Sequence, residues 1–152
     1  MSKSHIVIFR LVSMGDTIVV LPCFHAVRKA YPSAHITLLT NFPISTKAAP
    51  MFDLIGVESG IVDNAIGYNV GLNNPLEAIK LLYKLRILKT VTLIYKRSGP
   101  TWWIIFRDKI FFHLAGFYNI LCISKQKDQR VSRINPITLE VEPESKRLVR
   151  CF

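Results

Sequence analysis

The sequence predicts an α/β fold in which a doubly wound, mostly parallel sheet carries helices on both faces. Short runs rich in β-branched residues at 5–9, 35–40 and 90–95 are typical of strands buried on both sides. Segments with helix signals separate these runs, as in parallel crossover units. The length of 152 residues fits one domain, and half of the residues are hydrophobic, so a real core can form.

In the first half, residues 5–9 (HIVIF) are predicted to form the first strand. A helix is then expected to open at Gly15 or Asp16 and to stop before Pro32. Residues 35–40 (HITLLT) supply the second strand. Glycines and prolines break the following segment into short pieces, in which we expect one short strand at residues 60–65.

The second half is predicted to begin with a helix from Asn74 to about Lys89, because Asn is a preferred cap and Pro75 suits the first helical position. Three further elements follow, namely a strand at 90–95, a helix at 101–115 closed by Gly116, and a strand at 119–124.

The helix predicted at 101–115 is rich in aromatic residues. Its apolar residues at helical spacing are Trp103, Phe106, Ile110 and Leu114. The aromatic side chains Trp102, Trp103, Phe106, Phe111 and Phe112 could form a surface for a membrane or for stacked bases. The i, i+3 and i+4 spacing favours the other interpretation, in which they form the buried face of the helix.

Charge and cysteine content narrow the classes of partner. Twenty Lys and Arg against ten Asp and Glu give a net charge of +10, and residues 77–152 contribute +9 of it. This surplus favours an anionic partner, such as an acidic lipid surface or a phosphorylated substrate, whereas no recognised motif supports nucleic acid. Cys23, Cys122 and Cys151 form no CxxC pair, so we expect neither disulfides nor a zinc site, and a cytoplasmic location.

The loop after the first strand is the first place to search for a site, because ligands of such folds bind at the carboxyl ends of strands. The loop at residues 10–15 has one glycine and lacks both GxGxxG and the P-loop motif, so a dinucleotide site is disfavoured. Asp16 can simply cap the helix. It could also be a carboxylate that accepts a proton from a sugar hydroxyl.

The segment IVIFRLVSMGDTIVVLPCFHAVRKAYP resembles the opening of glycosyltransferase family 9, the heptosyltransferases of lipopolysaccharide synthesis. The matching residues are Arg10, Ser13, Gly15, Asp16, Leu21, Pro22, Tyr31 and Pro32. The resemblance implies the amino-terminal Rossmann-like domain of a two-domain GT-B enzyme. It also implies that Asp16 is the catalytic base and that Arg10, Ser13 and Gly15 line the acceptor pocket.

The resemblance further implies inverting transfer of a sugar from a nucleotide-diphosphate sugar to a lipopolysaccharide core or related glycan, with no metal or other cofactor. Residues 1–133 would form the acceptor-binding domain, and 134–152 would begin the linker to a donor-binding domain that is lost or separately encoded. The chain alone is then expected to be inactive, and to contact a lipid-linked acceptor at the anionic inner leaflet. The alternative is a non-catalytic basic module that binds an anionic membrane or nucleic acid.

Overall fold

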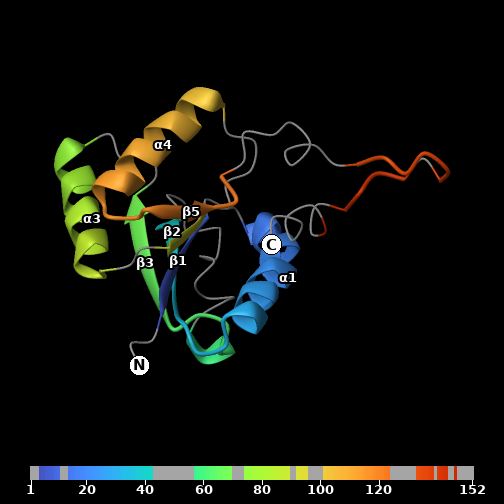
Figure 1. The fold of residues 1–152 in the computed structure, drawn as a ribbon, viewed down its shortest axis with the longest axis horizontal. Coiled ribbons are helices and arrows are strands. Elements are labelled where there is room, and N and C mark those ends of the chain that lie inside the picture. The colour runs from blue at the N-terminus through green and yellow to red at the C-terminus, as the bar shows by residue number, and fades with distance from the viewer. Residues whose placement is uncertain are drawn as a thin grey trace.

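A computed structural model describes residues 4–10, 14–42, 57–69, 74–89, 92–95, 101–123, 133–138, 140–143 and 146 (Figure 1). The strands are β1 (His5–Arg10), β2 (His35–Phe42), β3 (Asn64–Asn69), β4 (Thr92–Tyr95) and β5 (Asn119–Leu121). The helices are α1 (Met14–Ala30), α3 (Pro75–Ile87) and α4 (Trp102–Leu114), and Val57–Ser59 forms a short 3-10 turn.

Within the described residues the strands form one sheet in the order β3-β2-β1-β4-β5. Each neighbouring pair runs parallel, which confirms the predicted parallel α/β class. The chain moves outward from β1 through β2 to β3 and then returns to the other side of β1 as β4. Folds of this kind bind ligands where the direction reverses, so the carboxyl ends of β1 and β4 mark the expected site.

The described helices lie on both faces of the sheet, α1 on one face and α3 with α4 on the other (Figure 1). Alternate residues of β1 divide between the two cores, because successive strand side chains point to opposite faces. Ile6 and Ile8 pack with Phe24 and Val27 of α1. On the other face, β1 packs against α3 and α4, where Phe112 lies 4.9 Å from Phe9 between ring centroids.

Capping residues define the helix ends where the sequence predicts them. The Asn74 side chain accepts a hydrogen bond from the N–H of Leu76 at 2.9 Å and thereby caps α3. Gly116, at φ +97°, ends α4 in a left-handed conformation. The N–H of Phe117 then donates to the carbonyl of Phe112 at 3.0 Å, as in a Schellman motif.

The short strand expected at residues 60–65 exists but begins later than expected, because β3 starts at Asn64 and pairs there with Thr37. Gly60 adopts φ +68°, which turns the chain just before the sheet. Ile61 and Val62 are apolar because they fill the core beneath α1. Because both residues are buried, this segment has the apolar pattern of a strand, although the strand itself starts only at Asn64.

The prediction that the aromatic residues of α4 form its buried face is right for Phe112 and wrong for Trp102, Trp103 and Phe106, which are exposed. In α4 the residues that face the core are Ile105, Asp108 and Phe112. The predicted face is instead 46–63% exposed, at Trp103, Phe106, Ile110 and Leu114. Apolar residues occur on all sides of this helix, so helical spacing alone could not distinguish its inner face from its outer one.

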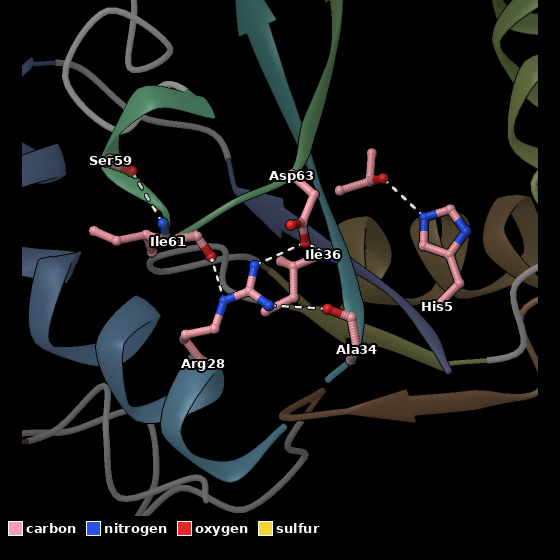
Figure 2. Close-up of polar contacts among 8 residues, drawn as sticks. His5, Arg28, Ala34, Ile36, Ser59, Ile61 and Asp63 are labelled. Atoms are coloured by element: carbon pink, nitrogen blue, oxygen red, sulfur yellow. Dashed lines mark hydrogen bonds and ion pairs between the residues drawn. The ribbon is translucent and has the colours of Figure 1, made fainter. Parts of the chain in front are cut away.

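At the amino-terminal edge of the sheet, Arg28 of α1 holds together three segments of chain (Figure 2). Its guanidinium donates to the carbonyl of Ile61 at 3.1 Å and to that of Ala34 at 2.9 Å. It also pairs with the Asp63 carboxylate at 2.7 Å, and the same oxygen accepts the N–H of Ile36 at 2.7 Å. Asp63 therefore links the start of β2, the start of β3 and α1.

These contacts make the stability of the protein depend on the charge of Asp63. Partial burial raises the pKa of this carboxyl, but the hydrogen bond from Ile36 and the Arg28 guanidinium outweigh it and hold the pKa below its ordinary value. A depressed pKa in the folded state means that the stabilisation is present above the unfolded pKa and is lost as the pH falls through the folded one.

We expect Asp63→Asn to lower the free energy of unfolding by about 1 kcal/mol at pH 7, because the hydrogen bonds to a charged acceptor are lost from a partly exposed site. Urea titrations at several pH values measure this. The difference from the wild type should persist down to about pH 5 and shrink below about pH 4. Glu58→Gln, which changes an exposed acid in the nearby 3-10 turn, is the control and should leave stability unchanged. A pH-independent deficit would contradict the assigned role of the charge.

Candidate functional site

The carboxyl edge of the sheet carries polar side chains in positions that are otherwise apolar. Arg10 ends β1 and pairs with Thr40 of β2, and both are buried, at 1% and 4% exposure. The Thr40 hydroxyl has no hydrogen-bond partner among the residues that the structure describes. Buried polar atoms are nearly always satisfied, so this edge is a place where a further polar group is expected.

Arg10, which the sequence analysis assigns to acceptor binding, does lie at this edge. By strand alternation it points to the same face of the sheet as Ile6 and Ile8, the face that α1 covers. Its side chain is enclosed, so contact with an acceptor would require neighbouring groups to move aside. The acceptor-binding role of Arg10 stays a prediction.

Two other predicted site residues, Gly15 and Asp16, lie at the start of α1, the helix that follows β1 in the chain. The helix starts at Met14, slightly earlier than expected, and Gly15 and Asp16 are in its first turn. The side chain of Asp16 and the whole of Ser13 lie outside the described residues, so their roles also stay predictions. The first turn of a helix carries a partial positive charge from its free N–H groups, which favours an ionised carboxylate there.

On the opposite face of the same edge lies a buried polar group that the sequence pattern did not predict. Tyr95 ends β4, next to Phe9 of β1, and its hydroxyl donates to the Asp108 carboxylate of α4 at 2.8 Å. Arg107 pairs with the second carboxylate oxygen of Asp108 at 2.8 Å. A detectable signal was the acid at position 108, which falls on the inner face of a strongly apolar helix.

The Tyr95–Asp108 bond fixes α4 against the end of β4. The Asp108 side chain is only 8% exposed, whereas that of Arg107 is 71% exposed. Arg107 therefore supplies the counter-charge for the buried carboxylate from the solvent side. Its attraction offsets the desolvation cost of burying Asp108. The contacts among Tyr95, Asp108 and Arg107 therefore hold α4 beside the place where the strand order reverses.

Two further findings bear on the chemistry of the site. In the part of the chain that the structure describes, no three His, Cys, Asp or Glu side chains gather closely enough to hold a metal ion. None of the described helices combines the length and apolar character needed to cross a membrane.

Comparison with known proteins supports the fold. No family model and no curated protein matches the sequence. Among solved structures, the chain is similar to a glycosyl transferase family 9 protein from Veillonella parvula DSM 2008, with a TM-score of 0.58 and 16% sequence identity. The match covers 99% of this chain and 42% of that one, so this chain spans less than half the length of its structural neighbour. At this identity the likeness shows a shared Rossmann-like fold.

Proposed function

We propose that this chain is the acceptor-binding part of an inverting glycosyltransferase of the GT-B type, acting on a lipopolysaccharide core or a related glycan. The observation that carries the proposal is the position of Asp16 in the first turn of α1, the helix that follows the central strand β1, where the strand order reverses. The likeness to a family 9 glycosyl transferase supports it at the level of fold. The sequence motif around Asp16 supports the heptosyltransferase-like choice of substrates.

In the proposed reaction Asp16 is the general base. An acceptor hydroxyl attacks the anomeric carbon of a nucleotide-diphosphate sugar, and the bond from that carbon to the diphosphate breaks with inversion. The hydroxyl becomes strongly acidic as its new bond forms, so a carboxylate can take its proton late in the step. The nucleoside diphosphate leaves with the electron pair of the broken bond.

The donor sugar is proposed to bind to a second α/β domain, on the same polypeptide or on a separate one. No residue of this chain is assigned to the donor, and the structural neighbour is more than twice as long. In this proposal the chain acts on the cytoplasmic side of the membrane, where nucleotide sugars are available. Without the donor-binding domain it does not transfer sugar. Turnover of a nucleotide sugar by the isolated chain would contradict this division of labour.

Acceptor binding is the direct test of the proposal. We expect a lipopolysaccharide core oligosaccharide to shift the backbone amide NMR signals of the carboxyl edge, at Arg10, Gly15, Asp16, Thr40 and Tyr95. The amides at the amino-terminal edge, Ile36 and Asp63, serve as internal controls and should stay in place. Shifts confined to the amino-terminal edge, or no shifts at millimolar oligosaccharide, would overturn the proposal.

The charge asymmetry of the chain favours the second candidate, a non-catalytic basic module for an anionic polymer or surface. A short RNA tests whether the anionic partner of this second candidate is a nucleic acid. Under this candidate RNA would bind with a steep dependence on salt concentration, because Lys and Arg displace counterions from phosphates. RNA binding without any response to the oligosaccharide would favour this candidate over the transferase.

A further inference from the structure

The layer formed by α3 and α4 exposes an unusually apolar surface to solvent. Large apolar side chains that are 46–65% exposed line the outer side of both helices, and we call them the outer face: Leu76, Ile79, Tyr83, Ile87, Trp102, Trp103, Phe106, Ile110 and Leu114. Single exposed apolar residues are common on proteins, but contiguous patches of this kind mark sites of interaction.

The geometry of the two helices makes these residues one surface. At about 100° per residue, Tyr83 lies opposite the buried pair Leu81 and Leu85 of α3. In the same way Ile110 lies roughly opposite the buried Phe112 of α4. Both helices pack on the same face of the sheet and contact each other (Figure 1), so both stripes point away from the sheet in the same general direction.

Basic side chains flank the stripes on both helices. Lys80, Lys84 and Arg86 are exposed on α3, and Arg107 and Lys109 are exposed on α4. The acids of these two helices are few: Glu77 at the start of α3, and Asp108, which is buried against Tyr95 and paired with Arg107. The surroundings of the outer face are therefore positively charged, which matches an anionic surface rather than a neutral one.

The aromatic residues narrow the choice of partner. Trp102 and Trp103 stack at 4.0 Å between ring centroids, both more than half exposed, at the amino-terminal end of α4. Indole and phenol rings with Lys and Arg beside them are the side chains that partition into the boundary between lipid headgroups and acyl chains. Exposed cations on both sides of the apolar stripe of α3 favour an anionic lipid surface over an uncharged protein partner.

We propose that the outer face docks onto a phospholipid bilayer that contains anionic lipids. The apolar stripes of α3 and α4 enter the headgroup boundary, and the flanking Lys and Arg contact lipid phosphates. The carboxyl edge of the sheet remains outside the bilayer, since the outer face points away from the sheet. This inference does not depend on the proposed transferase activity.

Tryptophan fluorescence tests the proposal directly, because the two tryptophans of the chain are both in the outer face. The probes are phosphatidylcholine vesicles with and without phosphatidylglycerol. Anionic vesicles should shift the emission to shorter wavelength, brominated lipids should quench it, and neutral vesicles should bind more weakly. An unchanged emission spectrum with anionic vesicles would overturn the proposal.

Variants that keep both tryptophans identify the surface. Phe106→Glu combined with Ile110→Glu, and separately Tyr83→Glu, should each weaken vesicle binding by about tenfold or more, because apolar area no longer enters the boundary. Lys80→Gln and Lys84→Gln should cost about fivefold each toward anionic vesicles. Ile18→Glu, at an equally exposed site on α1 across the sheet, is the matched control and should bind as the wild type does.

Two outcomes separate a bilayer from other occupants of the outer face. Equal binding by the outer-face variants and the wild type would overturn the proposal, since another surface would then hold the lipid. A blue shift that grows with protein concentration in the absence of lipid would also overturn it, in favour of a second copy of the chain. Failure of oligosaccharide binding at the carboxyl edge would leave the vesicle results unaffected, so the two proposals fail independently.

Discussion

Replacing Phe112 by alanine should lower the free energy of unfolding by about 3–5 kcal/mol. The Phe112 ring is 2% exposed and lies at the centre of an aromatic cluster. Its centroid distances are 4.9 Å to Phe9 and 5.9 Å to Phe117. Truncation leaves a cavity between α4 and the sheet that rigid strands cannot fill, and the loss is a large part of the roughly 5–15 kcal/mol typical of a domain.

Urea unfolding followed by far-ultraviolet circular dichroism measures this loss. Phe106→Ala is the matched control, because the same ring leaves the same helix from a position that is 55% exposed. It should change stability by less than about 0.5 kcal/mol. If Phe106 proved the more costly of the two truncations, the inner and outer sides of α4 would have to be exchanged.

The second large effect concerns activity. In an assay that supplies the donor-binding domain, Asp16→Asn should lower the rate of sugar transfer by about 10²- to 10⁴-fold, because the amide cannot accept the proton of the acceptor hydroxyl. Release of the nucleoside diphosphate measures the rate. Oligosaccharide affinity should change much less than the rate, since the base acts mainly in the transition state.

The control for Asp16 is Glu77→Gln, which also removes a carboxylate from the first turn of a helix, but on the opposite face of the sheet. It should leave sugar transfer unchanged and cost no more than about 1 kcal/mol of stability. A full rate in Asp16→Asn would remove this residue from the chemistry and leave only its role at the helix start.

The sequence predicted most of the architecture because the elements carry local signals. The β-branched runs, Asn74 with Pro75, and Gly116 act through nearby backbone, and each predicted its element correctly. The start of β3 escaped prediction because Ile61 is apolar for reasons of tertiary packing. Local pattern cannot tell a residue that enters a core from one that enters a sheet.

The sequence also failed to predict which side of α4 is buried, because apolar residues lie on both the inner and the outer side of this helix. On α4, Phe106 and Phe112 belong to different faces, and the tertiary contacts of Phe112 with Phe9, Tyr95 and Phe117 select the inner one. The Tyr95–Asp108 bond joins β4 to a helix that follows it, so its partners could not be paired from spacing alone. For the candidate site, the sequence predicted its place at the carboxyl edge, while the burial of Arg10 became evident only in the fold.

The strand order has a consequence for how this protein is made. β1 is the central strand, and one of its edges is completed by β4, which is translated more than half a chain length later. Until then the nascent polypeptide presents unpaired N–H and C=O groups along one edge of its central strand. Because non-local strand pairing forms slowly, this edge of β1 is expected to stay open to pairing with other chains for longer than an edge closed by a neighbouring segment.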